Sequence, residues 1–178
     1  MEDLDSYDSE SLFNGKMYRG NMYIFTYSAK NLTKYSYKGE DVYFADSLPV
    51  VLMTGETQST IRGINLNFCN KALKTLILNI LTNMDEDFYF GDLAQKQAFN
   101  KQVPISEKVY RFLSSNDAEE KIIEELNRAY SGIDYKFIFR NYAVANIKDI
   151  RLIEPWQWKY IPFLNYDSFD KGDTLKAI

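Results

Sequence analysis

The sequence predicts an α+β fold: a small curved antiparallel sheet or partly open β-barrel, packed by one amphipathic helix and carrying a helical insert. Three observations predict it. About five or six short runs of apolar and aromatic residues alternate with turn signals, as strands do. One segment, from Asn70 to Met84, has the periodicity of a helix that covers a sheet. Helix-favouring residues at about 92–131 then separate the early strands from the late ones.

The chain has 178 residues, enough for one domain with a core, which we place at 16–170 with a C-terminal tail at 171–178. Residues 1–15 predict an acidic, extended arm. We expect such an arm to become ordered only against a neighbouring molecule. Residues 1–10 have no base and carry the acids Glu2, Asp3, Asp5, Asp8 and Glu10.

The first strands are expected soon after the arm. Residues 15–30 predict one long strand or two short ones, with Gly20-Asn21 as a turn signal between them. Residues 32–44 are rich in aromatic and β-branched residues and predict a hairpin. Its tip is expected at Lys38-Gly39-Glu40-Asp41.

A buried part of the sheet follows. The step Asp46-Ser-Leu-Pro49 is expected to bend the chain into a buried strand at Val50–Met53. Residues 61–68 predict the next strand by their alternation. One face would carry Ile64, Leu66 and Phe68, and the other Asn65 and Asn67.

The helix at 70–84 is the clearest element of the sequence. Asn70 is a good N-cap residue, and Cys69 just before it is expected to be a small buried apolar residue. An apolar stripe at helical spacing should face the sheet; it contains Leu73, Leu76, Ile77, Ile80, Leu81 and Met84. Outside the stripe lie Lys71, Lys74 and Asn79.

Two further helices and the last strands complete the prediction. Ser106 is expected to cap a short helix, and Asn116 with Glu119 resembles a capping box for a second, which ends at Ser131-Gly132. Late strands are expected at Tyr135–Ile138 and Asp149–Ile153, and a last short strand within residues 154–172, which include both tryptophans.

Composition argues against most enzyme classes. The chain has no histidine, which removes the commonest general base and transition-metal ligand, and its single cysteine allows no internal disulfide. No glycine-rich phosphate loop occurs. The acidic run Asp85-Glu86-Asp87 lacks the ligand spacing of a calcium loop. We therefore expect a non-enzymatic protein with no cofactor and no bound metal. No signal peptide or membrane span is expected either.

Aromatic and basic residues alternate in the first third of the chain. Aromatics make up 16% of the sequence, with 14 Tyr and 12 Phe, while the net charge is −4. A nucleic-acid surface would use lysine and arginine for phosphates and tyrosine for stacking on bases. A protein interface would use the same aromatics as contacts, and both alternatives stay open. The candidate contacts are Lys16, Arg19, Lys30, Lys34, Tyr35 and Tyr37; candidate interface anchors are Leu12, Phe13, Trp156 and Trp158.

The order of short motifs resembles one protein family. The first motifs are an aromatic strand with Gly20, Tyr23, Phe25, Tyr27 and Lys30, and then Tyr43-Phe44, Asp46, Pro49 and Val50-Val51-Leu52. Next come Gly63-Ile64-Asn65-Leu66-Asn67-Phe68 before the helix, and finally Trp158, Ile161, Phe163-Leu164 and Phe169. In this order they resemble the small virion proteins of tailed bacteriophages described as DNA end protectors, which belong to the head-completion and neck region.

Several positions differ from the family pattern. The family commonly has His and Tyr where this chain has Asn67 and Phe68, and Arg where it has Lys74, which the resemblance adds to the candidate contacts. Ala45 separates the aromatic pair from Asp46 by one extra residue.

The resemblance implies a non-enzymatic virion structural protein, a neck or head-to-tail connector subunit present in several copies as a ring. Its partners would be other virion proteins of the neck or portal region. It would be made in the host cytoplasm and end in the virion, without contact with a membrane. The alternative function is a DNA end protector that binds the double-stranded termini of the packaged genome.

Overall fold

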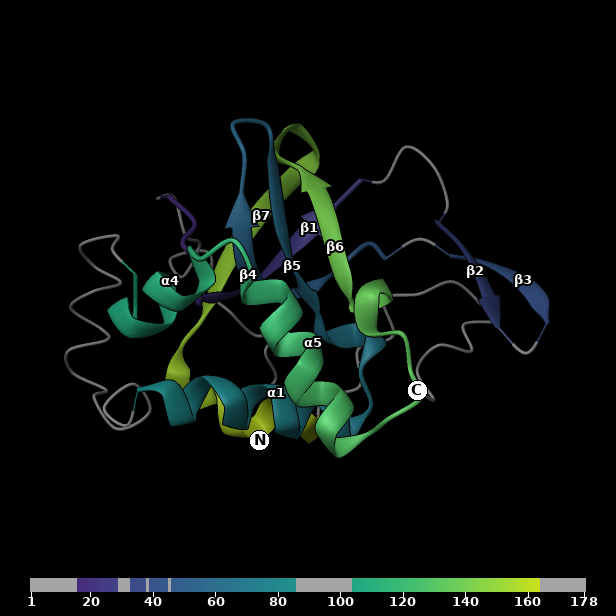
Figure 1. The fold of residues 1–178 in the computed structure, drawn as a ribbon. Helices are drawn as coiled ribbons and strands as arrows, with labels where there is room; N and C mark the ends of the chain where they lie inside the picture. Colours follow the sequence, from purple (N-terminus) through teal and green to yellow (C-terminus); the bar gives the residue numbers. More distant parts are fainter. Residues whose placement is uncertain (1–15, 29–32, 38, 45, 86–103, 164–178) are drawn as a thin grey trace.

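A computed structural model describes residues 16–28, 33–37, 39–44, 46–85 and 104–163 of the chain (Figure 1). Its centre is a five-stranded antiparallel sheet with the strand order β6-β5-β4-β1-β7. The strands are β1 (Met22–Tyr27), β4 (Val50–Glu56), β5 (Thr60–Asn65), β6 (Phe139–Ala143) and β7 (Ile147–Ile153). The predicted α+β class with an open, curved antiparallel sheet is confirmed. The described residues form seven strands, more than the expected five or six.

The sheet is strongly curled because its two edge strands are consecutive in the chain. Only the short 3-10 turn η5 (Val144–Asn146) joins β6 to β7. Four Cα steps span at most about 14 Å, whereas the outer strands of a flat five-stranded sheet would lie about 19 Å apart. The rings of Tyr27 on β1 and Tyr142 on β6 are accordingly only 5.1 Å apart between centroids, although β5 and β4 lie between these strands.

The curl gives the sheet an inner and an outer face, and both are buried. Successive residues of β1 from Met22 to Phe25 are therefore all buried. The inner face packs on itself and contains Tyr23, Phe25, Val51, Met53, Ile61, Tyr142 and Leu152. The outer face presents Met22, Ile24, Leu52 and Ile64 to the helices.

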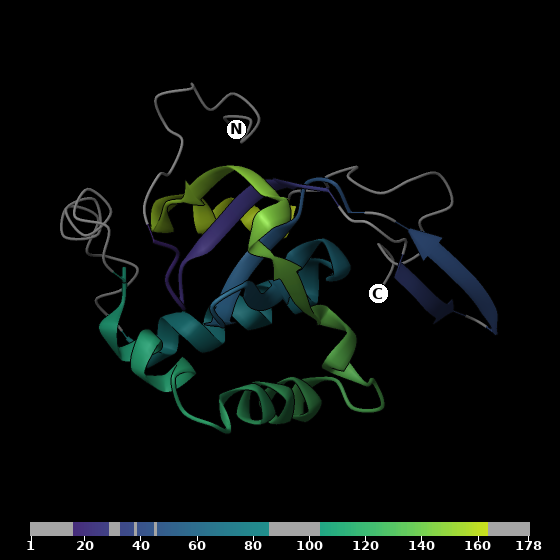
Figure 2. The same cartoon turned by 90° about the horizontal axis from the view of Figure 1, so that it is seen from above.

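The helix α1 (Lys71–Met84) covers the outer face, as predicted (Figures 1 and 2). The Asn70 side chain caps it by accepting a hydrogen bond of 2.9 Å from the Leu73 backbone N–H. Leu73, Ile77 and Leu81 of the predicted stripe are buried. The predicted position of Lys74 outside the stripe is wrong, because Lys74 is only 8% exposed. Burial lowers the pKa of its amino group.

The described part of the predicted helical insert contains α4 (Glu107–Leu113) and α5 (Ala118–Ala129). Ser106 caps α4 as expected: its Oγ accepts from the Val109 N–H at 3.2 Å. The predicted capping box at Asn116 is wrong. Asp117 holds the N-cap position of α5 and makes no side-chain cap bond. Glu119 turns towards the sheet instead, where it pairs with Arg62.

Two predicted strands are 3-10 helices instead, at least in part. The strand expected at 61–68 ends at Asn65, whose side chain accepts from the Asn67 N–H at 2.9 Å and starts η3 (Leu66–Phe68). Asp134 likewise caps η4 (Tyr135–Ile138), so the next strand begins only at Phe139. The stretch 154–172, where a last short strand is expected, forms η6 (Pro155–Phe163) in its described part, where Pro155 and Pro162 lack the N–H that a strand ladder needs. Its remainder lies outside the described residues.

A separate two-stranded hairpin, β2 (Thr33–Tyr37) and β3 (Glu40–Phe44), pairs outside the main sheet. Its predicted tip is confirmed: Gly39 has a φ of 81°, in the left-handed region that favours glycine. Both views show this hairpin extending away from the five-stranded sheet and from the helices (Figures 1 and 2).

The edge strand β7 contains a bulge. Ile24 pairs with Arg151 and Thr26 with Lys148, so Phe25 alone faces both Asp149 and Ile150. Asp149 has a φ of 52°, and among the described residues it is the non-glycine with a left-handed backbone. The bulge therefore interrupts the hydrogen-bonding ladder in the middle of β7.

Gly63→Ala should destabilise the protein strongly, by roughly 1–3 kcal/mol or more. A Cβ at Gly63 would lie 2.3 Å from Val51 Cγ1 and 2.5 Å from the Leu52 carbonyl oxygen. Gly55→Ala on the neighbouring strand is the matched control, because its Cβ would meet no atom within 4 Å. Urea unfolding of both variants measures the difference. Equal midpoints would show that the two strands approach less closely at Gly63.

Cys69 should react with thiol reagents only when the protein unfolds. The thiol is buried, as predicted, and burial raises its pKa from an ordinary 9.0 to about 12. The reactive thiolate is then about a thousandfold rarer in the folded chain at pH 8. Because the folded pKa is raised, this burial stabilises the fold fully below pH 9.0, and the stabilisation is lost as the pH rises towards 12. Fast labelling at pH 8 without denaturant would contradict the prediction.

Candidate interaction site

The register of the hairpin separates the candidate residues of β2 onto two faces. Tyr35 pairs with Val42, and Thr33 with Phe44, so these residues share one face with Tyr37. Lys34 pairs with Tyr43 and therefore belongs to the opposite face. A DNA surface would need the lysine and the tyrosines of β2 together. The register instead puts Lys34 with Tyr43 on one side of the ribbon, and Tyr35 and Tyr37 with Val42, Phe44 and Glu40 on the other. The second set has more aromatic and apolar positions, a composition that suits a protein interface.

A buried carboxylate fixes the chain just after β3. Asp46 accepts hydrogen bonds from Asn65 Nδ2 at 2.6 Å, Asn67 Nδ2 at 3.2 Å and the Leu48 backbone N–H at 3.2 Å. Asn65 is 1% exposed, and Asp46 and Asn67 are each 9% exposed. Such buried polar groups are stabilising only when their hydrogen bonds are made. The Asp46 step is thus more than the predicted bend: it is attached to the end of β5.

The same network reaches the edge of the sheet. Asn65 Nδ2 also donates to the hydroxyl of Tyr142 on β6, at 2.9 Å. The Tyr142 ring packs edge-to-face against Phe25 and Tyr27. Polar contacts therefore connect Asp46 with β5 and β6.

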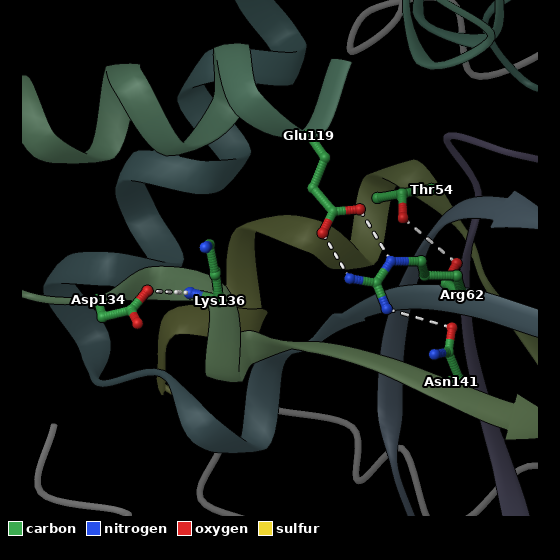
Figure 3. A network of polar contacts seen from close by, with 6 residues as sticks. All are labelled: Thr54, Arg62, Glu119, Asp134, Lys136 and Asn141. Atoms are coloured by element: carbon green, nitrogen blue, oxygen red, sulfur yellow. Dashed lines mark hydrogen bonds and ion pairs between the residues drawn. The ribbon is translucent and has the colours of Figure 1, made fainter. Parts of the chain in front are cut away.

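A polar groove lies between the sheet and the α4–α5 turn, with a cavity volume of about 320 Å³. In it, Arg62 binds Glu119 through two hydrogen bonds, Nε to Oε2 at 2.8 Å and Nη2 to Oε1 at 2.5 Å (Figure 3). Arg62 Nη1 also donates to Asn141 Oδ1 at 3.2 Å. The hydrogen-bonded carboxylate of Glu119 raises the pKa of Arg62. This pair ties α5 to β5.

Arg19, which lines the groove, belongs to a cluster in which two cations pack on two tyrosines. The rings of Tyr18 and Tyr110 meet edge-to-face with centroids 6.4 Å apart. Lys16 Nζ lies 5.1 Å from the first ring and Arg19 Cζ 5.9 Å from the second. Arg19 Nε also donates to Glu56 Oε2 at 2.8 Å. Both arginines that line the groove are thus paired with a carboxylate, so the groove lacks the excess positive charge that phosphate binding uses.

The predicted site residues are scattered rather than gathered in one place. Arg19 lines the groove and Lys16 lies over the Tyr18 ring, while β2 carries Lys34, Tyr35 and Tyr37. Lys74 is buried, which does not suit a contact with DNA. Lys30 and the anchors Leu12 and Phe13 lie outside the described residues.

The two tryptophans differ from each other. Trp158 is fully buried and donates through Nε1 to the Ile153 carbonyl at 3.1 Å, so it belongs to the core rather than to a partner surface. Trp156 is half-buried and donates to the Glu154 carboxylate. The network of Asp46, Asn65 and Asn67 was not predicted. Its signal was the pair of asparagines beside apolar residues of one predicted strand.

No family model, no curated protein and no solved structure matches this chain. The fold defines its class: an α+β protein built on an open, curled five-stranded antiparallel sheet. Among the described residues, no helix is long and apolar enough to cross a membrane. The same part of the chain brings no three potential metal ligands together.

Asp46→Ala should destabilise the fold by roughly 1–3 kcal/mol, because it leaves buried donors on Asn65 and Asn67 without their acceptor. Glu124→Ala is the control: it removes an exposed carboxylate in the middle of α5 and should leave the unfolding midpoint nearly unchanged. Urea denaturation followed by tryptophan fluorescence compares the two. If Asp46→Ala lowers the unfolding midpoint as little as Glu124→Ala does, the network does not contribute to stability.

Proposed function

We propose that the protein is a non-enzymatic structural subunit of a tailed-bacteriophage virion that works by binding protein neighbours. Its place would be the neck or head-to-tail connector, where several copies form a ring and contact other proteins of the neck or portal region. It would be made in the host cytoplasm and remain in the virion.

The observation that carries this proposal is the β2–β3 hairpin. It is a separate two-stranded sheet that extends from the domain (Figures 1 and 2). An isolated hairpin is marginally stable in water and gains stability from a surface that covers it. By register, Tyr35, Tyr37 and Phe44 share one side of the ribbon, a composition that suits an apolar protein surface.

The residues of the family resemblance give further support. Gly63 lies where another side chain would collide with β4. Asp46 and Asn65, from two separate motifs, are hydrogen-bonded at 2.6 Å. Trp158, from a third, is in the core. The residues of these motifs thus lie where they stabilise the fold. The resemblance therefore supports a fold shared with the family more than a shared DNA-binding surface.

A ring subunit needs two different contact surfaces, because closed rings use heterologous contacts. The hairpin leaves the domain on one side. The acidic residues of 1–10, which lie outside the described residues, differ from it in charge and are expected to supply the second contact.

One observation favours the second candidate, a DNA end protector. Lys16, Tyr18, Tyr110 and Arg19 form a cluster of cations and aromatic rings, which resembles a surface for phosphates and bases. Two observations favour the protein interface instead. Arg19 is paired with Glu56, and the register puts Lys34 on the other side of the ribbon from Tyr35.

Substitutions at positions on the two sides of the hairpin test the proposal. Tyr35→Ser with Tyr37→Ser should leave the unfolding midpoint of the domain nearly unchanged and reduce incorporation into particles at least tenfold. Lys34→Ser on the opposite face is the matched control and should incorporate normally. Incorporation is measured in particles from infected cells that receive the gene only from a plasmid.

The alternative function predicts the reverse pattern. Lys34→Ser or Lys16→Ala would then weaken binding to linear duplex DNA and reduce its dependence on salt. Normal incorporation of the double tyrosine variant would reject the hairpin as the partner-binding element.

A further inference from the structure

Both legs of the hairpin meet the sheet at one small group of residues, which we call the hairpin root: Tyr27, Asp46, Ser47, Asn65 and Tyr142. Tyr27 ends β1 and begins the leg that enters the hairpin. Asp46 and Ser47 belong to the leg that leaves the hairpin. They are the second and third residues after β3 ends at Phe44. Asn65 and Tyr142 belong to the main sheet.

The contacts of the hairpin root form a closed circuit. The Tyr27 backbone N–H donates to the Ser47 carbonyl at 3.0 Å, which joins the two legs. Asp46 accepts from Asn65 Nδ2 at 2.6 Å, and the same amide donates to the Tyr142 hydroxyl at 2.9 Å. The ring of Tyr142 returns to Tyr27, 5.1 Å between centroids and nearly perpendicular at 89°. A movement of one member therefore breaks a contact of the next.

Two more hydrogen bonds tie this circuit to the connection between the sheet edges. The Ser28 N–H donates to the Asn146 carbonyl of η5 at 3.2 Å, and the Ala143 N–H donates to the Tyr27 hydroxyl at 3.3 Å. The root is thus attached where the curl of the sheet is imposed.

From this geometry we infer that the hairpin root is a rigid mount, which fixes the two ends of the hairpin on the sheet and so limits the orientations in which the hairpin meets its protein partner. Asp46 and Tyr142 are its positioning residues. A buried polar network has one arrangement that satisfies its groups, so it resists distortion. A pre-oriented hairpin loses less conformational freedom when it binds. The use of the mount in binding rests on the proposed function, whereas the mount itself is a property of the isolated protein.

Distances between spin labels on the full chain test the mount. One label is placed at Glu40→Cys, near the hairpin tip, and the other at Glu124→Cys on α5; both positions are exposed. Cys69 stays unlabelled because it is buried. Pulsed EPR should give a narrow distance distribution for the parent. Asp46→Ala should widen it at least twofold, and Tyr142→Phe should widen it less, since only the hydroxyl contact is lost.

Two controls separate positioning from general loosening. Asn141→Ala changes the residue next to Tyr142. The Asn141 side chain accepts from Arg62 and makes no contact with the root that would be lost. Ile61→Val lowers the stability of the same sheet through its inner face. Both should keep the parent width.

A parent distribution as wide as that of Asp46→Ala would overturn the inference, and so would an Asp46→Ala distribution as narrow as the parent's. If Asp46→Ala does not fold, Tyr142→Phe alone tests the inference. A Tyr142→Phe distance distribution as narrow as the parent's would then reject the mount. A wide parent distribution together with tyrosine-dependent incorporation would reject the mount and leave the proposed function standing.

Discussion

Three residues connect the two edges of the sheet, and the rest of the domain is arranged around this constraint. Because η5 is so short, β6 must approach β7, and the five strands curl instead of lying flat. The curl creates an inner face that packs on itself and leaves the outer face for α1 and α5. It also brings Tyr27 against Tyr142 across two intervening strands, a contact that a flat sheet would not allow.

The buried polar groups connect this curled sheet to the projecting β2–β3 hairpin. Asp46 follows the hairpin, yet its carboxylate is bound by amides from the end of β5. A surface aspartate at this bend would leave the hairpin attached by its covalent connections and backbone bonds alone. Burial makes the attachment specific, because an unpaired carboxylate or amide there would be costly. Packing of the sheet and presentation of the hairpin therefore depend on the same few side chains.

The sequence was sufficient for the elements with a local signal. The α1 stripe with its Asn70 cap and the Gly39 hairpin tip followed from periodicity and turn chemistry. Two of the errors share a cause. In each, an Asn or Asp side chain accepts a hydrogen bond from a nearby backbone N–H, and a 3-10 turn forms where a strand was expected. Burial of Lys74 and the Asp46 network depend on contacts between distant segments, which alternation within one segment does not reveal.

The bulge in β7 has a consequence for the molecule at high concentration. An open sheet ends in unpaired N–H and C=O groups, and a long regular edge invites the edge of another copy to continue the sheet without limit. The left-handed Asp149 breaks the regular spacing of those groups halfway along β7. A foreign strand would find only short stretches to pair with. The irregularity thus makes the β7 edge a poor template for continued growth of the sheet.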